Sequence, residues 1–179
     1  PYIQLESIRD DGYLDISSVR SISREDYQKW ISRIEVTSGD CIITNVGRVG
    51  AIAQIPEGFK GAIGRNITSI RPKVNGLPPT FFIQALMSGQ FKKEVALRVD
   101  SGTILEALNV KNIPKLRLIR PSRGITTEYE STAKQLRNAV ETNMKESRVL
   151  TTLRDSLLPK LMSGELPIPD AERIVGRYL

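Results

Sequence analysis

Short apolar runs separated by turn residues fill the first two thirds of the chain. Residues 41–44, 51–55 and 67–71 are rich in β-branched side chains, and glycines and a proline lie between them. Runs of this length bounded by glycine and proline are typical of strands. The pattern therefore predicts a small, twisted and irregular sheet.

Two segments in the same region have the features of short helices. Residues 23–32 begin with Ser23, a good N-cap, and acidic side chains such as Glu25 follow it, where negative charge favours the start of a helix. Residues 80–88 are apolar, and we expect Gly89 to end the helix that they form.

The last strand predicted in this region covers residues 115–119, where apolar and basic side chains alternate. Such alternation is typical of a strand with one exposed face. The mixture of strands and short helices predicts an α/β fold of the mixed, α+β kind for residues 1–121. At 179 residues, the chain is long enough for one such domain and an appended element.

The pattern changes after Pro121 and Gly124. A heptad series follows, with members seven residues apart or four residues further on: Tyr129, Ala133, Leu136, Val140, Asn143, Leu150, Leu157 and Leu161. A helix over residues 126–158 would be about 50 Å long at about 1.5 Å per residue, which is too long to pack only on a small domain. We therefore predict helix pairing through Tyr129, Leu136, Val140, Leu150, Leu157 and Leu161. A helix packed within its own chain is the alternative.

The end of this helix is marked by Pro159 and Gly164, which indicate either a kink with a short final turn or a stop. Residues 122–166 are therefore assigned to the long helix, and residues 167–179 to a C-terminal tail. Asn143 lies in the seam, where a polar side chain can set the register against a partner helix.

Basic charge is concentrated in one part of the chain. The sequence has 26 Lys and Arg against 20 Asp and Glu, a net charge of +6. Residues 71–120 carry nine basic and three acidic side chains, whereas the segments on either side are close to neutral. Localised positive charge favours a polyanionic partner, but a solvated basic face would look the same.

The residue types present exclude several classes of activity. With no histidine and one cysteine, the chain has no Ser-His or Cys-His nucleophile pair, no histidine metal ligand, no structural zinc site and no internal disulfide. The acidic and lysine spacing of metal-dependent nucleases is missing from the predicted strands. We expect no enzyme, no metal and no cofactor on this chain.

Its compartment is predicted from the same composition. Cys41 lies beside Ile42 and Ile43 and reads as a buried thiol, which favours a reducing environment. No apolar run approaches the roughly 20 residues of a membrane span. A cytoplasmic protein without a membrane segment is therefore expected.

Candidate contacts to double-stranded DNA lie on predicted turns and in the basic stretch. The segment from Gly47 to Gly50 lacks the residues of a phosphate-binding loop and predicts a tight hairpin with Arg48 at its tip. Arg can pair with guanine, Asn with adenine, and Lys can neutralise phosphates. The candidates are Thr44, Asn45, Arg48, Lys60, Arg65, Asn66, Lys92, Lys93 and Lys111. For each basic residue, a solvated surface charge is the alternative.

Five segments, taken together and in order, resemble the specificity subunits of type I restriction-modification enzymes. They are residues 1–5 (PYIQL), 39–50 (GDCIITNVGRVG), 61–66 (GAIGRN), 108–113 (LNVKNI) and 153–166 (LRDSLLPKLMSGEL). The resemblance implies that residues 1–121 are a target-recognition domain and residues 122–166 a spacer helix.

In this family a full subunit has two such halves, whose helices pack antiparallel so that each domain reads one part of a split DNA site. The resemblance further implies binding to modification subunits and, through them, to restriction subunits. S-adenosylmethionine, ATP and Mg²⁺ are expected only on those partners. The chain would be one half, which pairs with a copy of itself or belongs to a longer subunit. The recognition domain of a fused restriction-methylase and a protein adaptor that does not bind DNA are the alternatives.

Overall fold

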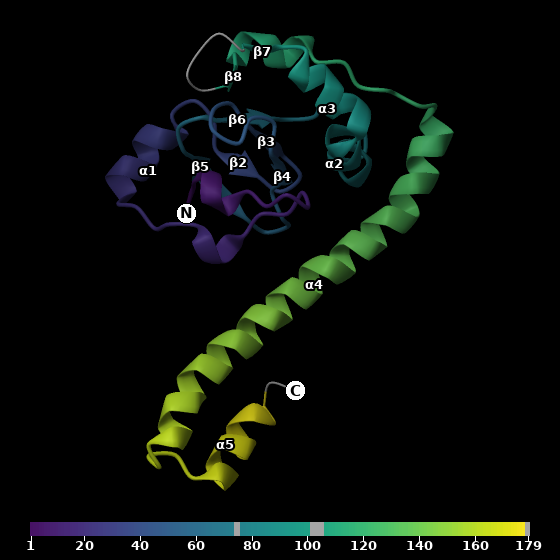
Figure 1. Ribbon diagram of the computed structural model, residues 1–179. Helices are drawn as coiled ribbons and strands as arrows, with labels where there is room; N and C mark the ends of the chain where they lie inside the picture. The colour runs from purple at the N-terminus through teal and green to yellow at the C-terminus, as the bar shows by residue number, and fades with distance from the viewer. Residues whose placement is uncertain (74–75, 101–105, 178–179) are drawn as a thin grey trace. The chain divides into compact units, whose positions relative to one another are not determined.

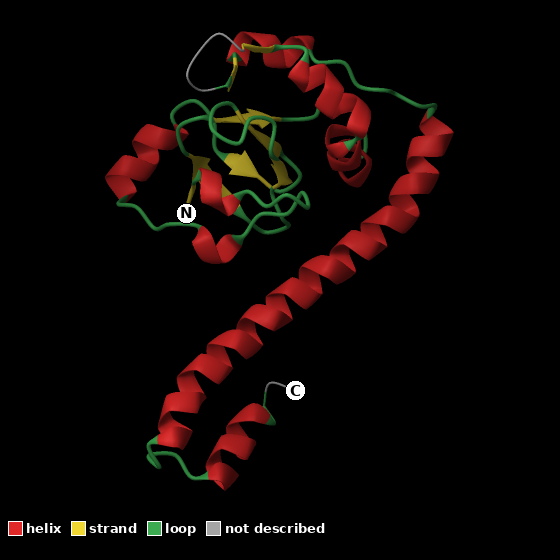
Figure 2. Ribbon diagram, in the orientation of Figure 1, coloured by secondary structure: helices red, strands yellow, loops and turns green. Residues whose placement is uncertain are grey.

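The computed structural model describes residues 1–73, 76–100 and 106–177, and these form two units, Pro1–Lys134 and Gln135–Leu179. The first unit combines short strands with short helices, and the second is helical (Figures 1 and 2). The strands are β1 (Tyr2–Ile3), β2 (Val36–Thr37), β3 (Cys41–Thr44), β4 (Ile52–Gln54), β5 (Lys60–Ile63), β6 (Ile67–Ile70), β7 (Val99–Asp100) and β8 (Ala107–Leu108). The helices are η1 (Leu5–Ser7), η2 (Ile16–Ser18), α1 (Arg24–Ile31), α2 (Pro79–Met87), α3 (Gly89–Ala96), η3 (Val110–Lys115), α4 (Arg123–Met162) and α5 (Ile168–Val175).

The strands of the first unit form small sheets rather than one large one. The antiparallel sheet has the order β4-β3-β6, and a second sheet has the order β1-β5-β2, in which β1 and β5 are parallel. Strands β7 and β8 form an antiparallel pair. The mixed α/β architecture expected from the sequence is confirmed.

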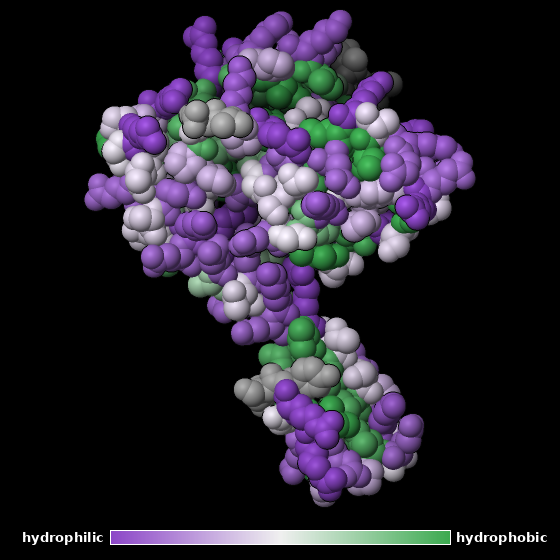
Figure 3. Space-filling view, turned by 180° about the vertical axis from the view of Figure 1, so that it is seen from behind, coloured by the Kyte–Doolittle hydropathy of each residue, from purple (hydrophilic) through white to green (hydrophobic). Residues whose placement is uncertain are grey.

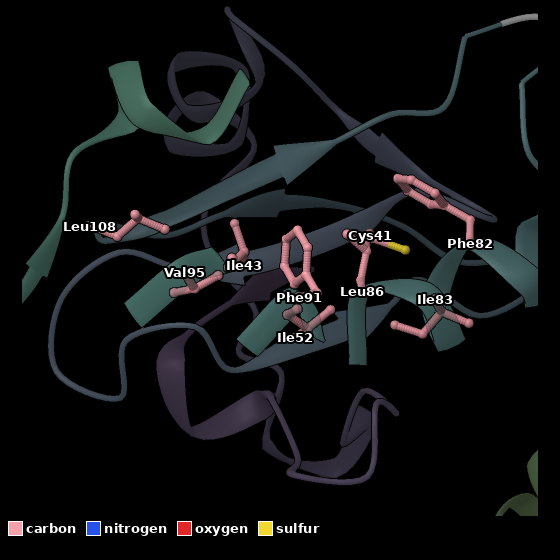
Figure 4. Close-up of a cluster of buried hydrophobic side chains, with 9 residues drawn as sticks. All are labelled: Cys41, Ile43, Ile52, Phe82, Ile83, Leu86, Phe91, Val95 and Leu108. Carbon is pink, nitrogen blue, oxygen red and sulfur yellow. The ribbon is translucent and has the colours of Figure 1, made fainter. Parts of the chain in front are cut away.

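Strand β3 is the centre of the core because both of its faces are buried. Successive side chains of a strand point to opposite faces, and so Cys41 and Ile43 join one apolar cluster while Ile42 joins another. The first cluster is completed by residues of β4, β8 and the two helices α2 and α3 (Figure 4). The second takes side chains from the N-terminal segment, β2, β4 and β6.

The N-terminus of α2 is capped from a distant part of the chain. The residue before the helix is Pro78, whose side chain offers no hydrogen bond. Instead the carboxylate of Glu130, in the second turn of α4, accepts from the backbone N–H of Thr80 at 3.2 Å and of Phe81 at 2.8 Å. A carboxylate is well placed there because the free amides and the helix dipole favour negative charge. Tyr129 adds an edge-to-face contact with Phe81, with ring centroids 5.6 Å apart.

The long helix α4 covers 40 residues and runs through Pro159 to Met162. Gly164, with φ of +74°, follows its end, and the backbone N–H of Leu166 donates to the carbonyl of Lys160. Helix α5 then runs back beside the last turns of α4 (Figure 1), and Ala171 is buried. None of the described helices carries an apolar stretch long enough to cross a membrane.

Most predicted elements are confirmed, with small shifts at their ends. The three predicted strands correspond to β3, β4 and β6, and the predicted helices to α1 and α2. Ser23 caps α1 by accepting from the backbone N–H of Asp26. The long helix starts before the predicted 126–158 range and ends after it.

Two features of this region differ from the predictions. Helix α2 ends at Met87, close to the predicted stop, but the sequence did not predict α3, which begins at Gly89 and is capped by Ser88 accepting from the backbone N–H of Phe91. Residues 115–119 do not form a strand. Pro114 lies in a 3-10 helix, and the backbone N–H of Arg117 donates to the Glu94 carboxylate instead of to a neighbouring strand.

Residues 167–179, predicted as a C-terminal tail, contain the helix α5. The alternation that suggested the strand at 115–119 has a different origin. Leu116 and Leu118 pack against the first apolar cluster, while Lys115 and Arg117 are exposed. The alternation therefore arises because one side of the segment is buried, and not because the segment pairs with a neighbouring strand.

Candidate nucleic-acid interface

Three segments meet just beyond the end of β3, and Asn45 joins them. Its backbone N–H donates to the carbonyl of Asn66 at 2.7 Å, and its side-chain amide donates to the carbonyl of Leu108 at 3.1 Å. The Oδ1 atom of Asn45 accepts from the hydroxyl of Thr68 at 2.7 Å. We call residues 46–51, 64–66 and 109–111, which extend from this junction, the loop cluster.

The first segment of the loop cluster is the hairpin between β3 and β4. Thr44 is buried, and its hydroxyl donates to the carbonyl of Arg48 while accepting from the backbone N–H of Ala51 at 3.0 Å. Gly47 and Gly50 have φ values of +88° and +80°, which favour glycine and permit the tight turn. The backbone around Arg48 is thus held at both ends, and the predicted hairpin is confirmed.

The other two segments also present polar side chains. Arg65 and Asn66 form the turn between β5 and β6, and both are exposed. Asn66 has a φ of +63°, a conformation that asparagine tolerates better than most residues. Lys111 is exposed near the start of η3, where its backbone N–H donates to Oδ1 of Asn109 at 3.0 Å.

The guanidinium of Arg48 contacts a fourth segment, the loop after η1. Its Nη1 donates to the carbonyl of Ile8 at 2.8 Å, and its Nη2 forms an ion pair with Asp10. The side chain of Arg48 is 46% exposed and that of Asp10 is 93% exposed. Asp10 could not be predicted from the sequence pattern, because 38 residues separate it from Arg48.

The loop that carries Asp10 is fixed by its neighbours. Asp11 accepts from the side chain of Arg9 and from the backbone N–H of Tyr13 at 3.2 Å. Burial opposes ionisation of Asp11, but these hydrogen bonds and the charge of Arg9 outweigh it, and the pKa of Asp11 is lowered. Asp11 is therefore a structural carboxylate that holds the turn next to Asp10.

A cavity of about 780 Å³ opens beside the hairpin. Asp10, Arg48 and Lys92 of α3 are among the polar residues that line it, and Leu86 and Phe91 form part of its apolar lining. Lys92 is consequently brought into the neighbourhood of Arg48, although 44 positions separate them. No group of three or more His, Cys, Asp or Glu residues that could hold a metal occurs in the described part of the chain.

The predicted contact residues therefore fall into three groups. Arg48, Arg65, Asn66 and Lys111 are exposed on the loop cluster, and Lys92 shares the cavity. Thr44 and Asn45 lie at the same place but are buried, with their polar atoms bonded within the domain. Lys60 and Lys93 are exposed elsewhere: Lys60 starts β5 opposite Thr37, and Lys93 follows Lys92 on α3.

Most of the predicted helix-pairing residues are exposed along α4. Tyr129, Leu136, Val140 and Leu150 are between 41% and 65% exposed, and Leu157 and Leu161 are half-buried. Leu158 and Met162, which were not among the predicted pairing residues, are also exposed. Figure 3 shows apolar side chains on the surface of the helical part at the bottom of the view, formed by the end of α4 and α5.

Half of the sequence is similar to a known protein. No family model matches the sequence. The chain is 33% identical over 90 residues to the type I restriction enzyme MjaIX specificity subunit of Methanocaldococcus jannaschii. The match covers 50% of this chain and 20% of that protein, so the chain matches only a fifth of its relative's length. The relative is by name a specificity subunit, which agrees with a role other than catalysis, and half of the chain is similar to such a subunit.

Proposed function

We propose that the chain is a DNA-recognition module of a type I restriction-modification complex and reads one part of a split double-stranded site. The observation that carries the proposal is the loop cluster, which places Arg48, Arg65, Asn66 and Lys111 on one edge of a small, well-packed domain. Loops held by a rigid scaffold are the usual location of recognition residues. The similarity to a specificity subunit supports the same role.

Exposure and bonding suggest different tasks for the candidate residues. Arg48 and Arg65 can donate to guanine, and Asn66 can pair with adenine. The four lysines Lys60, Lys92, Lys93 and Lys111 can neutralise phosphates, which positions the protein without reading sequence. Thr44 and Asn45 would have to break bonds within the domain to reach a base, and so we assign them to holding the loop cluster in shape.

The long helix is proposed to pair with a second helix and thereby to set the distance between two reading domains. The exposed apolar side chains of Tyr129, Leu136, Val140 and Leu150 support this role. A modification subunit is the proposed protein partner, with a restriction subunit bound through it. In such a complex S-adenosylmethionine, ATP and Mg²⁺ belong to the partners, and the complex is cytoplasmic.

Selection from random duplex DNA tests the proposal. We expect the chain, alone or with a modification subunit, to retain a specific sequence, and a dimer to retain an interrupted palindrome. With about four phosphates neutralised, affinity should fall about 100-fold between about 50 and 200 mM salt, because each contact releases condensed counterions. Affinity that does not change with salt, or retained DNA without a common sequence, would favour an adaptor that does not bind DNA.

Two substitutions separate reading from positioning. Arg48→Ala should lower the ratio of affinities for selected and random DNA about tenfold, because a base contact is lost. Lys92→Ala should weaken binding to both DNAs equally and reduce the slope of the salt dependence by about one. Competition binding with the two DNAs measures both effects. Equal changes in the ratio for the two variants would contradict these assignments.

A further inference from the structure

The ion pair between Arg48 and Asp10 leaves hydrogen-bonding groups of both kinds available. A guanidinium has five N–H groups, and Arg48 uses two of them, one for the Ile8 carbonyl and one for Asp10. In the described part of the chain, Arg48 is the hydrogen-bond partner of the Asp10 carboxylate. With the Asp10 side chain 93% exposed, several N–H donors therefore lie next to a carboxylate that can accept another hydrogen bond.

This combination matches one edge of a base pair. In the major groove, a G·C pair presents the acceptors N7 and O6 of guanine followed by the N4 amino donor of cytosine. An A·T pair presents an acceptor, then the adenine amino donor, then a further acceptor. Two N–H donors of Arg48 followed by an oxygen of Asp10 complement the G·C order and oppose the A·T order.

Charge favours a base over the DNA backbone at this position. An exposed arginine alone can bind phosphate as well as guanine. Asp10 makes the pair formally neutral, and its carboxylate repels phosphate oxygens at close range. The base edge carries no net charge, and so it is not repelled in this way.

The guanidinium is also held in place before DNA arrives. Arg48 is bonded at its carbonyl by Thr44 and at its guanidinium by Ile8 and Asp10. Side-chain ordering is an entropic cost of binding, and a side chain that is already ordered avoids part of it. Asp10 thus provides a hydrogen-bond acceptor for the base pair and also fixes the orientation of the Arg48 guanidinium.

We propose that Asp10 and Arg48 act as one unit that reads a single G·C base pair in the major groove, with Asp10 as a specificity-determining residue. The inference rests on the proposed function and adds to it a residue and the base pair that it recognises. Arg48 supplies the contact to guanine, and Asp10 supplies the contact to cytosine and restricts Arg48 to the base edge.

The test compares Asp10→Ala with wild type in the full chain, on the sequence that wild type selects and on random duplex DNA. We expect Asp10→Ala to bind the selected sequence about tenfold more weakly and random DNA as strongly as wild type or more strongly, since a negative charge is gone. A variant that is merely misfolded would bind both DNAs more weakly. Asp11→Asn is the matched control, because it removes a charge from the same loop but keeps the side-chain oxygen that holds the turn.

Two further measurements locate the contact. Replacing the guanine of the affected base pair by 7-deazaguanine, which lacks N7, should weaken wild type and leave Arg48→Ala unaffected. The effects of Asp10→Ala and Arg48→Ala should not add in the double variant. If wild type selects a sequence and Asp10→Ala retains the same affinity ratio, the inference fails and the proposed function stands. If wild type selects no sequence, both fail.

Discussion

Replacing Leu136 by aspartate is expected to lower self-association of the chain at least 100-fold. Leu136 is 65% exposed on α4, in line with the exposed side chains of Tyr129 and Val140. If this stripe is buried against a second helix, the substitution removes an apolar contact and places an unpaired charge in the seam. Sedimentation velocity over a range of protein concentrations measures the change in the dissociation constant.

A control variant on the same helix separates pairing from helix stability. Asn138 is exposed and lies two residues further along, about 200° around the helix from Leu136 at about 3.6 residues per turn. Asn138→Asp should leave the dissociation constant unchanged. Equal weakening by the two variants would show that added charge alone disrupts the assembly. A wild-type chain that stays monomeric would contradict pairing of this helix with a second copy of the chain.

Replacing Asp40 by alanine is expected to destabilise the first unit by about 2 to 3 kcal/mol, near the lower end of the cost of breaking a buried ion pair. The Asp40 carboxylate is buried and accepts from the backbone N–H of Thr37 at 2.8 Å and from Nε and Nη2 of Arg71 at 2.7 and 2.6 Å. The hydrogen bond to Asp40 raises the pKa of Arg71, against the opposing effect of burial. The substitution leaves these donors without their acceptor, while the partial exposure of Arg71 limits the loss.

Urea denaturation followed by the fluorescence of Trp30 measures this loss. Trp30 is the one tryptophan of the sequence, and its ring lies 5.0 Å from that of Tyr2 in the first unit. Glu25→Ala, which removes an exposed ion pair with Lys29, should cost less than about 1 kcal/mol. A midpoint for Asp40→Ala close to that of wild type would mean that Thr37 and Arg71 find other partners.

The elements that could be predicted from the sequence are those that form because of residues within the segment itself. Strand β3 is a short β-branched run, α1 has its own N-cap, and α4 has a sustained heptad pattern. Helix α3 was missed because Gly89 reads as a stop, although Ser88 caps the helix by accepting from the backbone N–H of Phe91. The exposed face of α4 was likewise predictable from spacing alone.

The candidate site was less predictable because distant segments build it. Asn45 was predicted from the sequence as a DNA contact, but it is buried, and its side-chain amide donates to the carbonyl of Leu108, which is 63 positions away. The pair of Arg48 and Asp10 brings together a hairpin and a turn 38 positions apart. Residue type and local pattern identify Arg48 as a candidate, but they contain no information about the carboxylate beside it.

The cap that Glu130 provides for α2 has a consequence for exchanging modules between proteins. The domain does not finish at Pro121, because two amides of α2 find their acceptor nine positions further on. A chimera joined at Pro121 would replace Glu130 by a residue of the other protein and leave the two amides of α2 without a hydrogen-bond acceptor. A junction after Lys134, where the first unit ends, would carry the acceptor along with its helix.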